Sequence, residues 1–249
     1  MAERRKYHAL VIDFGGGTFD VCVIATTKEG DINISEGKRM ARPLSASSNP
    51  IGGFFVNRVI AEEIIRKTLT PRNIQAKINK AFEFYRKWRK DGFDLSGLTP
   101  DYRNFVRNYH RSAYRIEEPK LALCRLIQNW GLDAPLNLSV PVAAPEDPFS
   151  ASPTAVNVQF SAGELRSAFR AKVWEPHLRP IIGFALQRAK QDLSGAPVTV
   201  VLLSGGSANV RWLIELLRRD FDTELNQAEI LTLKDFQEVV SKGLGAECA

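Results

Sequence analysis

The sequence is poor in cysteine and histidine, with three of each among 249 residues. Cys22, Cys124 and Cys248 are odd in number and far apart. This arrangement argues against a disulfide framework and favours the reducing cytoplasm. The histidines are scattered as well, and neither residue type shows the spacing of a metal site.

Long apolar runs are also missing. No stretch approaches the length of a membrane span, and the first residues lack the apolar segment of a signal peptide. We therefore expect a cytoplasmic protein with no membrane partner.

The residues that are present describe an ordinary globular chain. Its composition, 44% hydrophobic and 25% charged, is typical of soluble proteins, and its length suffices for one large domain or two small ones. The net charge of +6 and the pI near 9.3 favour anionic ligands, but they are weak support for nucleic-acid binding.

The most informative stretch runs from Ala9 to Ile24. An apolar run ends in Asp13-Phe14, Gly15-Gly16-Gly17-Thr18 follows, and a second apolar run begins. This pattern predicts two strands joined by a tight turn. Without Cβ atoms the turn could approach a phosphate closely and point its N–H groups at it. Asp13 could hold a Mg²⁺-bound water, and Thr18 could offer a hydroxyl group. The alternative is a glycine-rich hairpin that binds nothing.

Further along the chain the pattern is mainly helical. We expect a third strand near 31–35 and a polar loop at 42–50, followed by Gly52-Gly53, which either turn the loop or admit an anion to the next helix. Helical spacing recurs over 59–65, 74–88 and 102–116. In the second of these helices the aromatic residues follow the apolar stripe, so its basic side, around Lys87 and Arg89, is interpreted as a solvated face. Pro119 should open a new helix or mark a kink.

The last third of the chain carries a second glycine-bearing turn. Strands are expected at 136–142 and 156–160, and a capping box of Ser161 and Glu164 should start the next helix. Pro176 should restart the chain as another helix. The run 198–203 indicates a strand covered on both faces, and it leads into Ser204-Gly205-Gly206-Ser207 and a helix over 210–221. A short helix of small residues is expected at 239–246.

Taken together, these motifs resemble those of the seventy-kilodalton heat-shock chaperones, members of the actin-like ATPase superfamily. The segment 13–21 is similar to that family's second phosphate motif, 202–207 to its adenosine motif, and 243–246 to its second connecting helix. Glu117, Lys120 and Cys124 fall where the family grasps adenosine. The resemblance covers essentially the whole chain, but only the second lobe of the family's nucleotide-binding domain.

The resemblance implies a role for each matching residue. Asp13 and Thr18 would be the catalytic residues, with Asp13 ordering the water ligands of Mg²⁺. The phosphate groups of ATP or ADP would contact Gly15, Gly16, Gly17 and Thr18. The adenosine would contact Gly205, Gly206 and Ser207 on one side and Glu117, Lys120 and Cys124 on the other.

The sequence also departs from the family pattern. Phe54-Phe55 replaces an acidic pair, Cys124 replaces a serine, and Pro119 could turn Glu117 and Lys120 onto different faces. The first phosphate motif and a peptide-binding domain are not present in this chain. We therefore expect an incomplete molecular chaperone ATPase that binds nucleotide weakly and does not hydrolyse it alone, with a lobe-one polypeptide or a co-chaperone as a possible partner.

The expected fold is α/β, a ribonuclease-H-like, actin-like ATPase lobe. A mixed five-stranded sheet flanked by helices would form from 1–53 and 156–249, with a mostly helical subdomain, 54–155, inserted. The alternative function is a non-catalytic protein-interaction module that retains the fold. Nucleic-acid binding through Lys87 and Arg89 is the least favoured reading.

Overall fold

The structure, a computed structural model, describes residues 4–29, 40–68, 72–91, 97–127, 135–209 and 211–233. The chain divides into two compact units. The sheet unit consists of Met1–Gly53, Gln128–Asp133 and Val173–Ala249, and the helical unit of Phe54–Ile127 and Ala134–Lys172. In this division residues 156–172 fall in the helical unit, and the last segment of the sheet unit begins at Val173.

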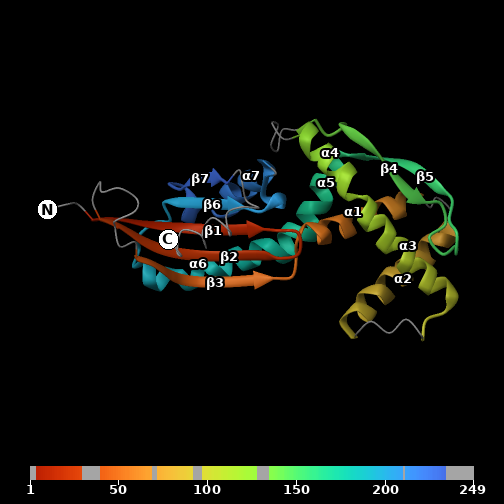
Figure 1. Ribbon diagram of the computed structural model, residues 1–249, viewed down its shortest axis with the longest axis horizontal. Helices are drawn as coiled ribbons and strands as arrows, with labels where there is room; N and C mark the ends of the chain where they lie inside the picture. The colour runs from red at the N-terminus through yellow and green to blue at the C-terminus, as the bar shows by residue number, and fades with distance from the viewer. Residues whose placement is uncertain are drawn as a thin grey trace, which may run out of the picture. The chain divides into compact units, whose positions relative to one another are not determined.

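The sheet unit is built on a mixed five-stranded sheet of order β3-β2-β1-β6-β7, which can be followed in Figure 1. The strands are β1 (Arg4–Phe14), β2 (Phe19–Glu29), β3 (Met40–Asn49), β6 (Val200–Ser204) and β7 (Glu229–Thr232). β1, β2 and β3 are antiparallel neighbours, whereas β6 runs parallel to both β1 and β7. The predicted α/β class and mixed five-stranded sheet are confirmed.

One face of this sheet forms the core of the unit. Side chains alternate along each strand, so Leu10, Ile12 and Phe14 of β1 share a buried face with Val21 and Val23 of β2. Helix α6 (Arg179–Leu193) packs on β2 and β3 and buries Ile182, Ala185, Leu186 and Ala189. The Ser45 hydroxyl of β3 donates to the carbonyl of Ala185 at 2.8 Å, which ties the helix to the sheet.

The segment expected to be a loop at 42–50 is instead most of β3. β3 is an edge strand, where the missing N–H of Pro43 interrupts no ladder on a second side. The pairing with β2 is irregular between Val23 and Ile24, and Pro43 lies at this irregularity. The hydrogen bonds with β2 outweigh the preference of the serines and prolines in this segment for a loop. The strand expected near 31–35 lies outside the described residues.

The strand β6 also differs from expectation. Val201 and Leu203 are buried, but Val200 and Leu202 are only half-buried by the described residues. The apolar run therefore alternates in burial within the described part of the chain, rather than being covered on both faces.

Four helices begin the helical unit: α1 (Gly53–Thr68), α2 (Arg72–Asp91), α3 (Pro100–Arg115) and α4 (Glu117–Ile127). They match the three predicted helices and the helix expected after Pro119, which lies in the first turn of α4, where a missing N–H costs nothing. An antiparallel hairpin of β4 (Ser139–Pro145) and β5 (Ala155–Ser161) follows, then α5 (Ala162–Phe169). The Ser161–Glu164 capping box is confirmed at the start of α5.

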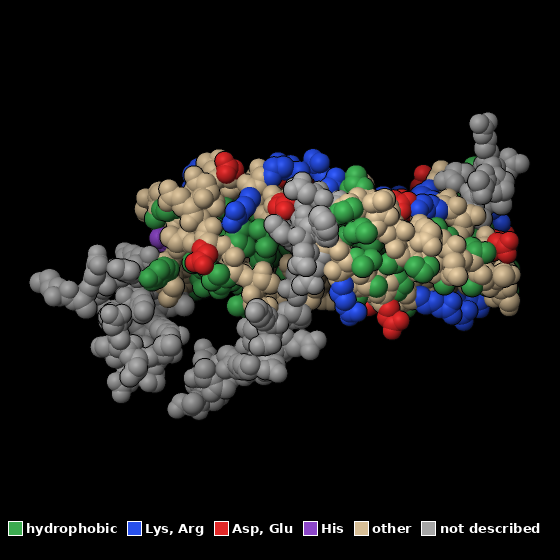
Figure 2. Space-filling model, turned by 90° about the horizontal axis from the view of Figure 1, so that it is seen from above, with side chains coloured by type: hydrophobic (Ala, Val, Ile, Leu, Met, Phe, Trp, Pro, Cys, Tyr) green, Lys and Arg blue, Asp and Glu red, His purple; other side chains and the backbone are tan. Residues whose placement is uncertain are grey.

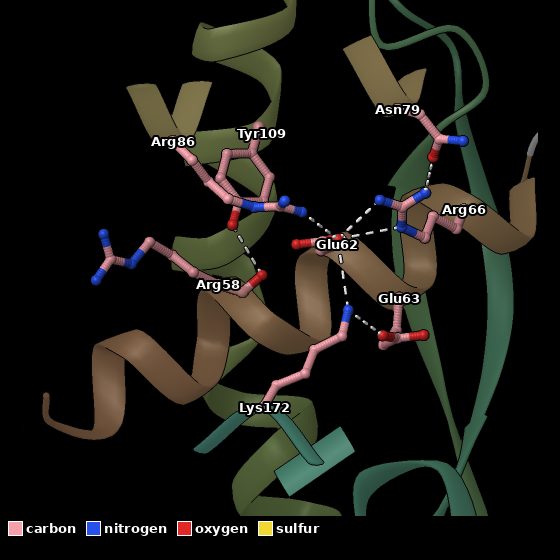
Figure 3. A network of polar contacts seen from close by, with 8 residues as sticks. All are labelled: Arg58, Glu62, Glu63, Arg66, Asn79, Arg86, Tyr109 and Lys172. Carbon is pink, nitrogen blue, oxygen red and sulfur yellow. Dashed lines mark hydrogen bonds and ion pairs between the residues drawn. The ribbon is translucent and has the colours of Figure 1, made fainter. Parts of the chain in front are cut away.

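An aromatic core and an ion-pair network hold these helices together. Phe82 of α2 meets Phe105 and Tyr109 of α3 edge-on, with ring centroids 5.1 and 5.3 Å apart. Beside this core, Glu62 of α1 accepts contacts from Arg66 (2.8 Å), Arg86 (3.2 Å) and Lys172 (3.4 Å). Figure 3 shows these three cations converging on Glu62 from α1, α2 and the end of this unit.

The chain returns to the sheet unit through η2 (Arg170–Leu178), a π-helical segment. Pro176 lies inside this segment, and the next helix, α6, begins at Arg179 with Pro180 in its first turn. The predicted restart at Pro176 is therefore displaced by three residues. After β6 come η3 (Gly206–Asn209), α7 (Arg211–Asp220) and α8 (Asp222–Leu225). The helix expected at 239–246 lies outside the described residues.

Among the helices of the described ranges, none has both the length and the apolar character needed to cross a membrane.

Candidate functional site

The glycine turn between β1 and β2 is closed by its own backbone. The N–H of Gly15 donates to the carbonyl of Thr18 at 3.0 Å, and the Thr18 hydroxyl donates to Asp20 Oδ2 at 2.8 Å. Gly16, Gly17 and Thr18 are exposed, while Phe14 and Phe19 on either side are buried and pack edge-to-face. Two buried rings therefore anchor a turn whose tip faces outward.

The backbone of Gly52 and Gly53 packs against this turn. A Cβ atom on Gly52 would collide with the peptide between Gly16 and Gly17, so no other residue fits at position 52 in this conformation. The N–H of Gly53 donates to the carbonyl of Gly15 at 2.9 Å. The N–H of Gly53 is therefore used within the protein.

The second glycine turn lies directly against the first. β1 and β6 are parallel neighbours with Asp13 opposite Ser204, so Gly205 follows at the same end of the sheet. Gly205 has φ +88°, and a Cβ there would come within 2.6 Å of Asp13 Oδ1 and even closer to the Phe14 carbonyl. Only glycine satisfies both the backbone angle and this close approach. Gly206 and Ser207 follow in η3, exposed and half-buried respectively.

Within the described part of the chain, Gly16 and Gly17 have no comparable reason to be glycine. A Cβ on either would meet no atom within 4 Å, and neither residue has a positive φ. The fold would thus accept alanine at both positions. A ligand that approaches the backbone closely would account for two glycines that packing against the described residues does not require.

A pair of carboxylates stands beside the turn. Asp13 and Asp20 are directly opposite each other across β1 and β2, so their side chains share one face of the sheet. Burial and the charge of Asp20 raise the pKa of Asp13 above its usual value. The two acids line an open hollow of about 380 Å³ together with Val11, Val21, Cys22, Ala46, Ser47 and Ser48.

Asp13 and Asp20 are suited to a cation whose remaining ligands are waters and a bound substrate. No group of three or more His, Cys, Asp or Glu side chains in the described ranges could hold a metal ion by itself. Mg²⁺ is commonly bound by one or two carboxylates, several waters and the phosphates of a substrate. A positive ion would also offset the repulsion from Asp20, which adds to the effect of burial on the pKa of Asp13.

Glu117, Lys120 and Cys124 belong to the helical unit, where they follow one face of α4. Lys120 Nζ lies 2.8 Å from Glu117 Oε2, so Pro119 does not separate their side chains as the sequence had suggested. The Asn57 amide donates to the same Glu117 oxygen at 2.6 Å. Burial raises the pKa of Glu117, but the bonds from Lys120 and Asn57 outweigh it and lower the pKa overall.

Cys124 is a protonated thiol in this setting. Burial, opposed by Lys120 and assisted by Glu117, raises its pKa to about 11. A neutral thiol packs as a small apolar side chain and is only a weak hydrogen-bond donor.

Phe54 and Phe55, two neighbouring aromatic residues of α1, make contacts within the helical unit. The guanidinium of Arg58 lies 5.7 Å from the ring centroid of Phe54 and 5.3 Å from that of Phe55. Phe54 also contacts Tyr114 of α3, with centroids 4.8 Å apart. These two positions therefore make cation–π and ring contacts within the helical unit rather than acidic ones.

A scan against models of known protein families and a search of curated proteins gave no match to this chain. The site is therefore argued from its geometry. Sequence reasoning gave no role to Asp20 and did not find the contact of Gly52 with the turn. Asp20 could have been found from the sequence, because a two-strand hairpin places it opposite Asp13.

Proposed function

We propose that the sheet unit binds the phosphate groups of a magnesium–adenine nucleotide at the Gly15–Thr18 turn. In this proposal the chain is the second lobe of an actin-like ATPase of the heat-shock chaperone type. The observation that carries it is the close approach of Gly205 to Asp13 and Phe14, which brings two glycine-bearing turns together at the ends of parallel strands.

The position of these turns supports the proposal on physical grounds. Ligands of open α/β sheets bind beyond the carboxyl ends of the strands, where the chain leaves neighbouring strands in different directions. β1 is such a strand, since it turns directly into antiparallel β2 on one side and has parallel β6 on the other. Gly16 and Gly17 offer open backbone at this point, and Asp13 offers a carboxylate.

Each residue has a definite task in this proposal. The exposed turn would surround phosphate oxygens, and the Thr18 hydroxyl, now bonded to Asp20, would move to a phosphate oxygen. Asp13 would hold a water ligand of Mg²⁺. Phosphoryl transfer depends on positioning and charge stabilisation. A chain with only one set of phosphate contacts should therefore bind nucleotide weakly and turn it over immeasurably slowly.

The adenosine-contacting role of Glu117, Lys120 and Cys124 is a separate part of the proposal. It is supported by the contact of Lys120 with Glu117, which matches the grasp that the resemblance implies. The phosphate-binding role of the turn does not depend on it.

Calorimetric titration of the full chain with Mg-ATP and Mg-ADP tests the proposal, alone and with a lobe-one polypeptide of a heat-shock ATPase added. The informative variant is Gly16→Ala/Gly17→Ala, which fills the turn without touching the protein. We expect it to fold normally and to weaken nucleotide binding about tenfold or more, because the added methyl groups obstruct the phosphates.

Gly97→Ala is the matched control, since a Cβ there also meets nothing within 4 Å, and it should leave binding unchanged. If neither nucleotide gives a heat or a thermal shift, even with lobe one present, the proposal is wrong.

The second candidate is a non-catalytic interaction module. It is favoured by Phe54 and Phe55, whose ring contacts with Arg58 and Tyr114 replace the acidic function expected there. ATP hydrolysis by the isolated chain that Asp13→Asn abolishes would rule this candidate out.

A further inference from the structure

The exposed side of α3 carries a row of four arginines that the nucleotide proposal does not use. Arg103, Arg107, Arg111 and Arg115 recur at every fourth position, and all are exposed. The opposite side of the helix is buried through Phe105, Val106, Asn108, Tyr109, Ser112 and Ala113. We call these four residues the arginine row.

The arginine row is not neutralised within the described part of the chain. Arg107 donates to the neutral Asn104 side chain, and none of the four arginines forms an ion pair with a described residue. Like charges four residues apart on a helix repel each other. A row of like charges that no acid among the described residues compensates favours binding of an anionic partner.

The excess positive charge of the whole protein belongs to the unit that carries this row. The helical unit has 19 Lys and Arg against 11 Asp and Glu, whereas the sheet unit has 15 against 17. Several Lys and Arg side chains are visible over the helical unit in Figure 2. A polyanion would be attracted to this unit and not to the other.

An exposed aromatic ring stands among the arginines. Tyr114 is 71% exposed, and it lies on the same side of α3 as Arg107 and Arg111, which precede it by two turns and one turn. Phe54 supports the ring from α1 at a centroid distance of 4.8 Å. An exposed tyrosine held in place by a second ring is a surface on which a planar group can stack.

A further cation lies behind these rings and forms no ion pair with any residue that the structure describes. Arg58 is only 8% exposed, its Nε has no hydrogen-bond partner, and its guanidinium lies against Phe54 and Phe55. In Figure 3 its side chain points away from Glu62, and the interaction drawn for it is made by its backbone carbonyl with Tyr109. Arg58 therefore adds positive charge next to Phe54, the ring that contacts Tyr114.

A hollow adjoins the far end of the row. Its volume is about 310 Å³, and it is lined by Arg111 and Arg115 together with Asn108, Ser112 and the segments 143–145 and 151–155. Asn108 donates to the carbonyls of Pro148 and Ser150, and its Oδ1 has no partner. The hollow beside Arg111 and Arg115 can therefore accept a group larger than a single ion.

We propose that this face of α3 binds single-stranded nucleic acid, with the arginine row contacting successive phosphates and Tyr114 stacking on a base. Proteins that bind single strands without sequence preference combine a positively charged track with exposed aromatic rings. The four arginines span about 18 Å along the helix axis, which suits a short stretch of extended strand. An acidic protein segment would satisfy the arginines, but it would give no role to the exposed ring.

The surface is distinct from the basic side of α2 around Lys87, which has no exposed aromatic residue between its described lysines. It also does not depend on the glycine turns, so failure of the nucleotide proposal would leave it untouched.

Fluorescence anisotropy of a labelled 12-nucleotide uridine or thymidine strand with the full chain tests the proposal. Four phosphate contacts on a single strand predict a slope of log affinity against log salt of about −2.8. Arg107→Glu/Arg111→Glu should reduce that slope by about 1.4 and weaken binding by about a hundredfold at low salt. Lys80→Glu/Lys87→Glu makes the same charge change on exposed residues of α2 and should weaken binding only slightly.

The ring is tested separately. Tyr114→Leu should weaken binding about tenfold, whereas Tyr114→Phe should leave it unchanged, because stacking needs the ring and not the hydroxyl. Circular dichroism verifies that each variant is folded. The proposal is overturned if the α2 variant loses as much affinity as the α3 variant, if Tyr114→Leu binds normally, or if a 12-residue poly-glutamate peptide competes as well as unlabelled strand.

Discussion

At the scale of single residues, Asp13 is a carboxyl group that the fold makes difficult to ionise. Burial and the charge of Asp20 raise its pKa in the folded chain. Between the ordinary carboxyl pKa and this raised value, the folded chain keeps a proton that the unfolded chain has lost. The free energy of unfolding therefore decreases as the pH rises through that interval. At neutral pH the ionised Asp13 still lowers it slightly.

We predict that Asp13→Asn raises the melting temperature at pH 7 by about 1–2 °C when Mg²⁺ is absent, since solvent screening keeps such an effect below about 1 kcal/mol. The same variant should lose the stabilisation that Mg-ATP gives to the natural chain. Thermal melting with and without Mg-ATP measures both effects, and a lower melting temperature of the free variant would contradict this account of Asp13.

Glu62 shows the opposite linkage. Burial by itself would raise its pKa, but the hydrogen bond from Arg66 and the charges of Lys172, Arg66 and Arg86 lower it overall. Its contribution to stability is complete above the ordinary carboxyl pKa and is lost as the pH falls through the lowered value. Glu62→Gln should cost about 1–3 kcal/mol at pH 7, because Arg66, Arg86 and Lys172 lose a negatively charged partner.

Urea unfolding at pH 7 and at pH 3 tests this prediction, and the difference between Glu62→Gln and the natural chain should shrink at the lower pH. The exposed Glu83 on α2 provides the control, since Glu83→Gln makes the same chemical change outside the network. A pH-independent difference would show that Glu62 does not act through its charge.

Cys124 should be an unreactive thiol. Its pKa of about 11 leaves almost none of it as thiolate at pH 8. We expect its alkylation, followed by peptide mass mapping, to be at least about tenfold slower in the folded chain than in urea. Equal rates in the two states would contradict the raised pKa of Cys124.

At the scale of elements, glycines that look alike in the sequence have different tasks. Gly205 has φ +88° and lies against Asp13 and Phe14, so Gly205→Ala should destabilise the chain by about 2 kcal/mol or more. Gly183 lies within α6, and a Cβ there would only reach ordinary contact with Phe221, 3.6 Å away. Gly183→Ala should therefore be neutral or stabilising by up to about 1 kcal/mol. Urea unfolding of both variants distinguishes the two glycines.

The elements that could be predicted from the sequence are those with a local cause. The helices follow apolar periodicity, and the start of α5 follows from the reciprocal bonds of Ser161 and Glu164. β3 could not be predicted, because its Pro43 and serines favour a loop until β2 supplies hydrogen bonds. In the same way, the hairpin of the candidate site could be read from Asp13 and the glycines, whereas the support from Gly52 depends on a contact between segments 35 residues apart.

At the scale of the whole molecule, the two units differ in the sequence separation of the segments that pack together. α2 and α3 of the helical unit pack as near neighbours in sequence, but His8 of β1 exchanges hydrogen bonds with Thr199, which is 191 residues away. Contacts between distant segments form late because closing a long loop costs entropy.

We predict that in refolding followed by pulsed hydrogen exchange, the amides of α2 and α3 become protected before those of β1 and β6. Two-dimensional NMR or mass spectrometry of the labelled chain would measure this order. Simultaneous protection of both sets would indicate that the units fold as one.

The parallel pairing of β1 with β6 has a consequence during synthesis. A ribosome adding about 5–20 residues per second needs roughly 10–40 s to pass from β1 to β6. Until then, the edge of β1 that will receive β6 has no strand beside it, although it lies at the centre of the finished sheet. A nascent chain in this state offers an open, apolar strand edge to any other chain nearby. The pairing that builds the candidate site therefore also leaves the newly made chain open to strand pairing with other chains until β6 has been synthesised.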